Sequence, residues 1–251
     1  MWNPYDFTGK KIVIAGGTSG IGSATAKLLA DQGADIYLLG RNQEKLNDVL
    51  NDLYGKGHKS YVVDFNQTVR YKDIFDDIIS DRRKIDGVVY CVGQVRLLPV
   101  NSMKRALMDE TMTVNLYSFI ELLSVFSKNK YHDGASVVGI SSIASVYPQK
   151  GQGLYAASKS AMNAFVTSLS QELVKKGIRI NTVMPGATDT RMYQNAIQDK
   201  SPEEQEKMEK RQILGISDPA EIANVIVFLL SDASKVITGR EIYADGGFVN
   251  V

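Results

Sequence analysis

Cysteine and histidine are almost absent from this sequence. Its 251 residues include one cysteine, Cys91, and two histidines, His58 and His132. One cysteine cannot form an intrachain disulfide, and so few sulfur and imidazole ligands exclude a zinc site built from them. We therefore expect no metal centre and a cytoplasmic location, with Cys91 serving as a small buried apolar residue.

Long apolar runs and an excess of one charge are also missing. No stretch approaches the ~18 apolar residues of a membrane-spanning helix, and the first residues lack the apolar core of a secretory signal. Lys and Arg total 29 against 28 for Asp and Glu, a net charge of +1. Such a balance gives no general attraction to nucleic acid or to anionic membranes. We expect neither as a partner, so any binding site is local.

Short β-branched runs alternate with segments of helical apolar spacing. The expected strands cover residues 11–15, 35–39, 59–65, 85–93, 135–141, 177–184 and 239–247. Strands that are apolar throughout and separated by helices predict a parallel sheet with helices on both faces. The fold class is therefore α/β, a Rossmann-type doubly wound sheet of about seven strands. No linker or repeat divides the chain, so we expect one domain over residues 1–251.

One segment departs from this rhythm. Residues 191–216 are rich in charged side chains and lie between a Pro-Gly turn and the last long helix. Their composition is compatible with a solvated surface helix and with a mobile lid over a site. Composition alone leaves both open.

Residues 15–22, AGGTSGIG, place glycines where the first expected strand turns into a helix. Gly16, Gly20 and Gly22 allow positive φ angles there and bring the backbone close to a ligand. The first turn of the new helix offers free N–H groups to an anion. A tight turn without a ligand is the alternative, but the strand-to-helix context favours a nucleotide phosphate.

The end of the second expected strand distinguishes between two nucleotides. A site for NAD usually has an acidic residue about 20 positions after the glycines, which holds the ribose 2′-hydroxyl. Gly40 and Arg41 stand in this region instead. A guanidinium pairs with a 2′-phosphate, unless Arg41 only opens the next helix and faces solvent. We predict NADP(H) rather than NAD(H).

Further motifs follow in a fixed order. Asn115 lies within TVNLYSF, and Ser142 precedes Tyr155 by thirteen residues. Tyr155 begins the sequence YAASK and so is paired with Lys159 four positions later. Residues 185–190, PGATDT, follow the next strand.

With the glycine loop and with Asp64 in VVDF, these motifs resemble the classical short-chain dehydrogenase/reductase family. The resemblance runs from about residue 9 to residue 247 and is greatest to 3-oxoacyl-(acyl-carrier-protein) reductases. Two departures stand out: Ala15 replaces the usual threonine, and residues 90–93, YCVG, stand where Asn-Asn-Ala-Gly is common. The second puts in doubt the usual asparagine contacts behind the cofactor.

The resemblance implies a catalytic tetrad of Asn115, Ser142, Tyr155 and Lys159, with residues 191–216 as the substrate lid. It implies that Lys159 holds the nicotinamide ribose, that Asn115 fixes a water linking the lysine to solvent, and that Asp64 lies near the adenine. The implied cofactor contacts are Gly16, Thr18, Ser19, Gly20, Ile21, Gly22, Arg41, Asn42, Asp64, Gly93, Asn115, Tyr155, Lys159, Pro185, Gly186, Thr188 and Thr190.

The tetrad suits proton transfer to a carbonyl oxygen. Tyr155 and Lys159, four residues apart, share one face of a helix. We expect the nearby cation to lower the pKa of the phenol, so that Tyr155 acts as the general acid or base. Ser142 is expected to donate a hydrogen bond to the same oxygen.

We therefore expect an enzyme, an NADP(H)-dependent oxidoreductase that interconverts a ketone and a secondary alcohol. A 3-oxoacyl thioester is the leading substrate, and a sugar, polyol or small ketone is the alternative. A non-catalytic NADP sensor or scaffold is less favoured, because Tyr155 and Lys159 are both present.

Two expectations concern partners. Basic residues near the entrance, Lys128, Lys130 and Lys176, would suit an acidic carrier protein, although lysines at helix C-termini also interact with the helix dipole. The resemblance implies a homotetramer or homodimer, paired through two helices that carry Phe119, Leu122, Leu123, Phe126, Met162, Phe165, Val166 and Leu169.

Overall fold

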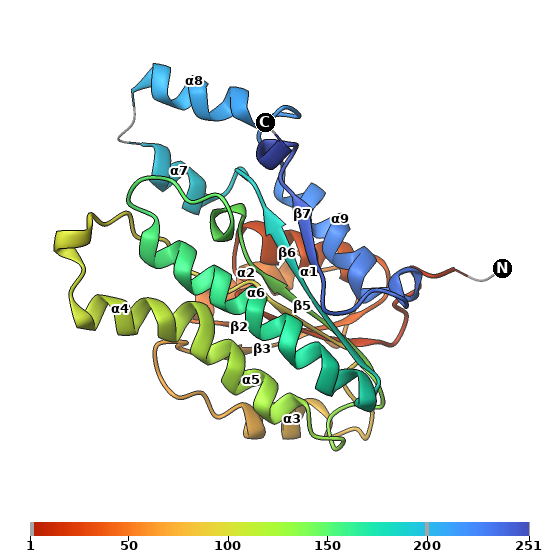
Figure 1. Cartoon of the computed structure of the whole chain (residues 1–251). Coiled ribbons are helices and arrows are strands. Elements are labelled where there is room, and N and C mark those ends of the chain that lie inside the picture. The colour runs from red at the N-terminus through yellow and green to blue at the C-terminus, as the bar shows by residue number, and fades with distance from the viewer. Residues whose placement is uncertain (1–2, 199–200, 251) are drawn as a thin grey trace.

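A parallel sheet of seven strands forms the centre of the protein (Figure 1). The computed structural model describes residues 3–198 and 201–250. Within them the strand order is β3-β2-β1-β4-β5-β6-β7, and every neighbouring pair is parallel. The strands are β1 (Lys11–Ala15), β2 (Asp35–Gly40), β3 (Lys59–Val62), β4 (Gly87–Tyr90), β5 (Ala135–Ile140), β6 (Ile178–Pro185) and β7 (Glu241–Ala244). The predicted doubly wound α/β fold is confirmed.

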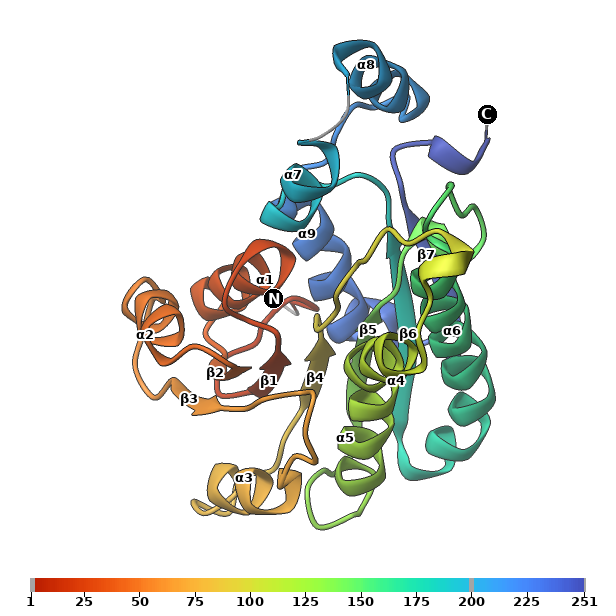
Figure 2. The ribbon, with the colours of Figure 1, turned by 90° about the vertical axis from the view of Figure 1, so that its left-hand side faces the viewer.

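Helices cover both faces of the sheet (Figure 2). Helices α1, α2 and α9 pack on one face, and α3, α5 and α6 pack on the other. The helices are α1 (Gly20–Asp31), α2 (Gln43–Asn51), α3 (Tyr71–Ile78), α4 (Arg105–Met112), α5 (Ser118–Phe126), α6 (Gly153–Leu173), α7 (Arg191–Ile197), α8 (Pro202–Arg211) and α9 (Pro219–Leu230). Among the helices of the described residues, none has the length and apolarity that crossing a bilayer requires.

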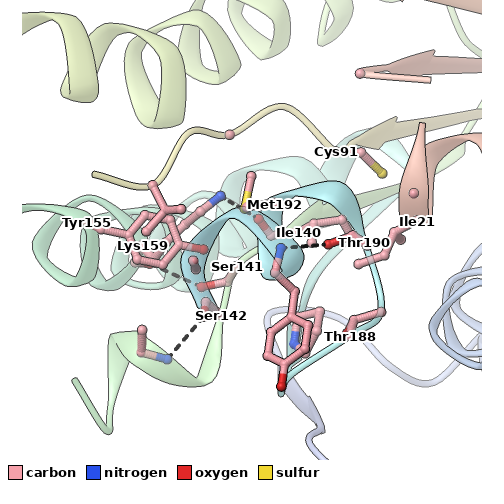
Figure 3. Close-up of a pocket in the computed structure, with 18 of the residues that line it drawn as sticks. Ile21, Cys91, Ile140, Ser141, Ser142, Tyr155, Lys159, Thr188, Thr190 and Met192 are labelled. Carbon is pink, nitrogen blue, oxygen red and sulfur yellow. Dashed lines mark hydrogen bonds between the residues drawn. The ribbon is translucent and has the colours of Figure 1, made fainter. Parts of the chain in front are cut away.

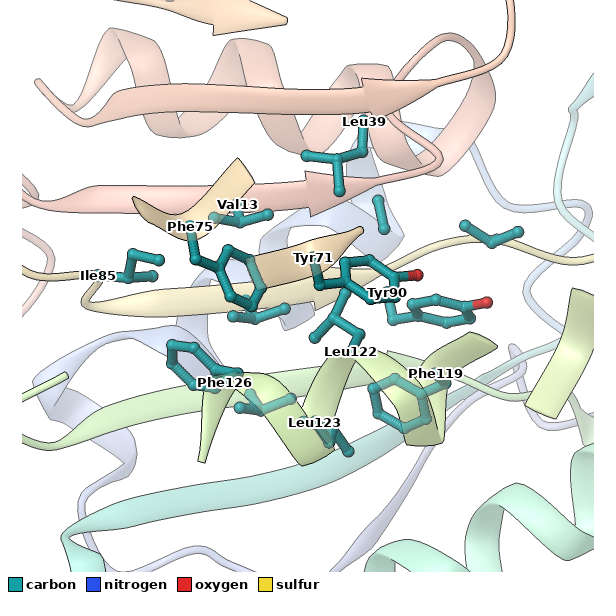
Figure 4. Packing of buried hydrophobic residues seen from close by; sticks show 14 of the residues in the cluster. Val13, Leu39, Tyr71, Phe75, Ile85, Tyr90, Phe119, Leu122, Leu123 and Phe126 are labelled. Carbon is teal, nitrogen blue, oxygen red and sulfur yellow. The ribbon is translucent and has the colours of Figure 1, made fainter. Parts of the chain in front are cut away.

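Each face of the sheet has its own apolar core. Strand β1 is buried along its whole length and sends Val13 to one core and Ile14 to the other. Tyr71, Phe75 and Phe126 fill the core under α3 and α5 (Figure 4). Strands buried on both faces need apolar residues at successive positions, which is why their sequences do not alternate with polar residues.

Strands β3 and β4 are shorter than the sequence predicts. The expected ranges 59–65 and 85–93 shrink to Lys59–Val62 and Gly87–Tyr90, because the chain leaves the sheet after each strand. These departures lie at the carboxyl edge. Strand β1 lies between β2 and β4, so the chain winds in opposite directions on its two sides, and a crevice opens at such a switch point.

The apolar residues expected to pair subunits belong to the protein's own core. Phe119, Leu122, Leu123, Phe126, Met162 and Val166 are at most 2% exposed, and Phe165 and Leu169 pack against the same cluster. The six buried side chains cannot contact another subunit, whereas Phe165 and Leu169 are only partly buried, and the pairing of the two helices between subunits stays a prediction. An interface on this face would use exposed neighbours such as Thr167 and Ser168.

The three lysines expected at the active-site entrance lie far from it. Lys128 and Lys130 follow α5, and Lys176 follows α6, so all three stand at the amino edge of the sheet before β5 and β6. Tyr155 lies in the first turn of α6, and a rise of ~1.5 Å per residue puts Lys176 roughly 30 Å away. Lys130 pairs there with Asp76 at 2.6 Å. The predicted basic entrance is therefore wrong in position.

Candidate active site

A cleft of about 410 Å³ opens across the carboxyl ends of the strands. Figure 3 shows side chains from α6, from the end of β5 and from the segment after β6 converging on it. Its lining includes the catalytic candidate Ser142 and most of the residues expected to hold a cofactor, namely Gly16, Thr18, Ser19, Gly20, Ile21, Gly22, Arg41, Gly93, Tyr155, Lys159, Pro185, Gly186, Thr188 and Thr190. The lining carries three cations, Arg41, Lys159 and Arg191, and no acidic side chain among the described residues. Such a cleft suits an anionic ligand.

The glycine loop wraps the turn between β1 and α1 tightly. Gly16 has a φ of +82°, a conformation that other residues rarely adopt. A Cβ on Gly22 would overlap the carbonyl oxygen of Gly16, so the helix can start this close only with glycine there. No side chain among the described residues caps the first turn of α1, and that turn holds no acidic residue. Its N–H groups therefore face the cleft free for a phosphate.

Arg41 lies at the edge of this cradle, one residue beyond β2. Its side chain is exposed and lines the cleft. No carboxylate of the described chain pairs with it, so its charge is not neutralised from within the protein. Asn42 does not line the cleft. Its side chain accepts a hydrogen bond from the N–H of Lys45 at 2.9 Å and caps α2.

Tyr155 and Lys159 share the cleft-facing side of α6, as their spacing predicts. Their exposed fractions are 9% and 3%, and the Lys159 ammonium lies 6.0 Å from the centroid of the Tyr155 ring. Lys159 Nζ donates a hydrogen bond to the carbonyl of Ile140 at 2.7 Å. This bond anchors the amine to the end of β5, so the lysine is held in place by the sheet itself.

Burial shifts the protonation of both groups. It raises the pKa of Tyr155, against a smaller opposing effect of its hydrogen bond with Ser142. Burial lowers the pKa of Lys159 to about 8. The expectation that the lysine lowers the phenol's pKa is wrong, because desolvation disfavours the phenolate more than its surroundings favour it. Tyr155 is therefore a neutral phenol at pH 7, ready to give a proton.

Ser142 lies just beyond β5 and faces the same space. Its Oγ accepts a hydrogen bond from the N–H of Ala144 at 3.1 Å, where a short 3₁₀ turn, Ile143–Ser145, begins. A hydroxyl has one proton and two acceptor positions, so this bond orients the oxygen and uses one of its acceptor positions rather than its proton. Ser142 can therefore donate to an oxygen held beside Tyr155.

Asn115 lies behind the cleft and does not line it. It is fully buried in a π-helical turn, Thr113–Tyr117, between α4 and α5. Its Oδ1 accepts from the N–H of Gln94 at 2.8 Å, and its Nδ2 donates to the Gln94 carbonyl at 3.0 Å and to Ser158 Oγ at 2.9 Å. The side chain thus clamps the segment after Gly93, a contact that the resemblance does not imply.

Asp64 also lies outside the cleft lining. Its carboxylate accepts hydrogen bonds from the N–H of Asn66 at 3.0 Å and from Gln67 Nε2 at 3.4 Å, within its own turn. The neighbouring Phe65 lines the cleft instead. Asn42, Asp64 and Asn115 are thus the three expected cofactor contacts that do not line the cleft.

Cys91 differs from its expected position. The side chain is half-buried and lines the cleft, whereas a fully buried position was predicted. Burial raises the pKa of the thiol to about 12, so it stays protonated at neutral pH. A thiol of this kind is a poor nucleophile.

The segment after β6 forms the far wall of the cleft. Thr190 caps α7, because its Oγ1 accepts from the N–H of Tyr193 at 3.3 Å, and Thr188 Oγ1 donates to the carbonyl of Gly186 at 3.3 Å. Both hydroxyls therefore have partners within the protein. Helix α7 adds Met192 to the cleft. Residues 191–216 thus border the site at their N-terminal end.

Gln212 is a residue that the sequence did not reveal. It is 1% exposed, and its amide bonds Ala187, Gly215 and Ser217. It joins the end of α8 to the segment beside Pro185–Gly186. A glutamine within a charged stretch carries no signal of burial, because its partners are backbone groups brought near only by the fold.

Aromatic and apolar side chains complete the part of the cleft beyond Tyr155. Val95, Ile143, Tyr147, Met192 and Phe248 line it, together with the amides of Gln149 and Gln152. These residues come from separate segments: the loop after β4, the segment after β5, helix α7 and the C-terminal end. No motif singled them out, since they determine the shape of a pocket rather than a local turn.

Comparisons with known proteins agree with this arrangement. A family profile described as "Enoyl-(Acyl carrier protein) reductase" matches residues 15–249. The 3-oxoacyl-[acyl-carrier-protein] reductase FabG of Thermotoga maritima is 32% identical over 247 residues, which are 96% of this chain and 98% of that protein. The L-xylulose reductase of Caenorhabditis elegans is 28% identical over 98% of each chain.

A similar fold is known from a solved structure. The short-chain type dehydrogenase/reductase of Mycobacterium ulcerans superimposes with a TM-score of 0.89 at 26% identity, covering 98% of this chain and 91% of that one. It shares the sheet and helices that frame the cleft described above. With a family profile that matches nearly the whole chain, these likenesses show that the chain belongs to the short-chain dehydrogenase/reductase family, whose members are oxidoreductases that use a nicotinamide cofactor.

Proposed function

We propose that this protein is an NADP(H)-dependent enzyme that reduces a ketone to a secondary alcohol. The observation that carries the proposal is that Ser142, Tyr155 and Lys159 all line the cleft beside the glycine cradle, with Tyr155 and Lys159 buried. Because burial raises the pKa of Tyr155, the phenol holds its proton at neutral pH. A protonated phenol can supply the proton that carbonyl reduction requires.

The residues of the cleft fit a dinucleotide phosphate. The tight loop at Gly16 and Gly22 and the free N–H groups of α1 would hold the pyrophosphate, and Lys159 would hold the nicotinamide ribose. Arg41, exposed at the rim without an acidic partner, would pair with the 2′-phosphate that distinguishes NADP from NAD. When bound, the reduced cofactor supplies a hydride.

Three side chains of the protein would bind, protonate and stabilise the carbonyl oxygen of the substrate. Ser142 donates a hydrogen bond to this oxygen and fixes its position. Tyr155 gives its proton to the same oxygen as negative charge develops there. Lys159, held by the Ile140 carbonyl, offsets that charge through its own positive charge. The apolar walls around the trio exclude water and strengthen these interactions.

The substrate that fits best is a 3-oxoacyl thioester. Beyond Tyr155 the cleft is lined mainly by apolar and aromatic groups, including Ile143, Met192 and Phe248. A sugar needs several hydrogen-bonding partners. Gln152 Oε1 is not one of them, because it accepts a hydrogen bond from the N–H of Gln149 at 2.9 Å. The relative from Thermotoga maritima is named for an acyl carrier substrate.

A sugar or polyol is the second candidate. The relative from Caenorhabditis elegans is named for L-xylulose, and Gln149 and Gln152 add polar side chains to the cleft lining. The two candidates differ in the groups next to the carbonyl, so a kinetic panel separates them.

The remaining expectations complete the proposal. The chain acts as one domain, with residues 191–216 as its substrate lid, of which residues 199–200 lie outside the described part. It works in the cytoplasm on a small molecule as a homodimer or homotetramer. A sedimentation profile showing only monomer at micromolar concentration would contradict the last point.

The decisive experiment follows NADPH consumption with β-ketoacyl thioesters, small ketones and sugars. We expect the highest kcat/KM with a β-ketoacyl thioester, and Tyr155→Phe should lower kcat by about 10²–10⁴-fold while binding NADPH normally. A protein that binds NADPH but reduces nothing would favour a non-catalytic sensor. Retained turnover in Tyr155→Phe would refute the assigned acid.

A further inference from the structure

Tyr90 is the last residue of β4, and its hydroxyl reaches the helical layer beside the sheet. The side chain is fully buried, and the hydroxyl donates to the carbonyl of Val114 at 2.8 Å. Ser118 Oγ contacts the Tyr90 hydroxyl and donates to the same carbonyl at 3.1 Å. Two hydroxyls therefore converge on one backbone oxygen.

That oxygen belongs to the π-helical turn Thr113–Tyr117, at the residue before Asn115. A π-turn inserts one residue into a helix; such turns are rare and frequently occur at functional sites. The hydroxyls of Tyr90 and Ser118 add two side-chain hydrogen bonds to this turn, both to the Val114 carbonyl.

The turn directs Asn115 toward two parts of the site. Its amide bonds the N–H and carbonyl of Gln94, and it donates to Ser158 Oγ, which in turn donates to the carbonyl of Tyr155 at 2.7 Å. Asn115 thus connects the loop after β4 with the first turn of α6.

This connection bears on Lys159. A Cβ placed on Gly93 would lie 3.3 Å from Lys159 Nζ and 3.7 Å from Asn115 Oδ1. The backbone at Gly93–Gln94 therefore packs against the Lys159 side chain, and the hydrogen bonds of Asn115 to Gln94 hold this backbone in place.

The Tyr90 ring is locked as firmly as its hydroxyl. Its centroid lies 4.7 Å from that of Phe119 and 6.2 Å from that of Phe65, which meets it edge-on. Figure 4 shows Tyr90 and Phe119 at the base of α5, near Tyr71. The ring cannot swing away, so the hydroxyl is a fixed support.

We propose that Tyr90 is a positioning residue for the reaction: its hydroxyl holds the π-turn open at Val114 and thereby sets Asn115 against Gln94. The effect on turnover rests on the proposed function, whereas the effect on Gln94 does not. Tyr90 stands where the family commonly has asparagine, so this chain reaches the turn with a longer side chain.

The test compares Tyr90→Phe with Tyr71→Phe. Tyr71 is equally buried in the same cluster, and its hydroxyl donates to the carbonyl of Ser118 at 3.1 Å, outside the π-turn. Each variant loses one buried hydroxyl, so both should lower Tm by roughly 2–4 °C. Only Tyr90→Phe should lower kcat, by about tenfold, with the KM for the ketone changed less than twofold.

Hydrogen–deuterium exchange supplies a readout besides activity. The Gln94 amide, protected by Asn115, should exchange faster in Tyr90→Phe and stay protected in Tyr71→Phe. The Leu98 amide, bonded to the Gly151 carbonyl at 2.9 Å, is the internal reference. Ser118→Ala is the second variant and should also make the Gln94 amide exchange faster. It keeps the proposal testable if Tyr90→Phe does not fold.

Three outcomes decide the matter. Faster Gln94 exchange confined to the Tyr90 and Ser118 variants supports the proposal, as does the selective fall in kcat. Unchanged Gln94 exchange in both variants, or an equal effect in Tyr71→Phe, overturns it. If the unaltered protein reduces no ketone, the proposed function fails while the exchange comparison still decides the role of Tyr90.

Discussion

The side-chain amide of Gln212 bonds both polar groups of Ala187. Its Oε1 accepts from the Ala187 N–H at 2.8 Å, and its Nε2 donates to the Ala187 carbonyl at 3.0 Å. Nε2 also reaches the carbonyl of Gly215 at 2.6 Å. One buried amide thus ties the wall of the cleft to the end of α8.

We predict that Gln212→Leu destabilises the protein and weakens cofactor binding together. Leucine fills a similar volume but leaves the Ala187 N–H without its partner, while the Ala187 carbonyl keeps the N–H of Ser217 at 3.1 Å. We expect a cost of about 1–3 kcal/mol in the free energy of unfolding. The loosened segment should also raise the KM for the cofactor. Thermal unfolding and initial rates measure the two effects.

The control for Gln212 is the same substitution at Gln43. Gln43 is exposed, donates to Asn47 Oδ1 at 2.8 Å and does not line the cleft. Gln43→Leu should change Tm and KM little, because an exposed amide exchanges its bond for water. An equal effect at both positions would show that Gln212 has no special part in the wall.

Local spacing made much of this site predictable. Gly16 and Gly22 both lie at the turn from β1 into α1, and Tyr155 and Lys159 both lie on α6. Residues close in sequence therefore determine how each pair is arranged. The apolar strands predicted the parallel sheet for the same reason. Where a motif and its partner are close in sequence, the sequence was sufficient.

Contacts between distant segments were not predictable in this way. Lys176 was expected near the entrance, yet the direction of α6 carries it to the other edge of the sheet. The pKa of Tyr155 was expected to fall, yet burial raises it, and burial depends on the loops that close the cleft. Asn115 and Gln212 bond backbone groups, which no side-chain pattern identifies.

Arg41 should determine the choice of cofactor. Arg41→Asp removes the cation and places a carboxylate where a 2′-phosphate would lie, so it should reverse the preference toward NADH. We expect the ratio of kcat/KM for NADPH to that for NADH to fall by about 10²-fold or more, since one charge-assisted bond is lost and a repulsion is added.

Arg70 is a suitable control for Arg41. It is exposed and paired with Asp73 at 2.7 Å on α3, away from the cleft. Arg70→Asp makes the same change in net charge and should leave the cofactor ratio unchanged. A ratio that Arg41→Asp does not alter would remove the argument for the 2′-phosphate.

The buried charge of Lys159 should lower the free energy of unfolding by an amount that depends on pH. Burial lowers its pKa from 10.5 to about 8, so the folded chain releases a proton that the unfolded chain keeps between these values. Its contribution to the free energy of unfolding is therefore least favourable below pH 8 and recovers as the pH rises toward 10.5. At pH 7 the penalty is on the order of 3 kcal/mol.

Lys159→Met should consequently raise Tm at pH 7 while abolishing turnover. The gain is partly offset because the Ile140 carbonyl loses its donor, at about 1 kcal/mol. The gain should shrink as the pH approaches 10, where the unaltered lysine is neutral in the folded protein. Thermal unfolding of both proteins across pH 7–10, without added cofactor, measures the difference.

A second buried lysine gives the opposite expectation. Lys11 is 1% exposed but pairs with Asp81 at 2.6 Å, and this bond holds the pKa of the Asp81 carboxyl well below its usual range. Lys11→Met removes that partner and should lower Tm at pH 7 as well as at pH 10. A gain at Lys159 that persists unchanged to pH 10 would show that packing, rather than the charge of the amine, limits stability there, because only the charge disappears over that range.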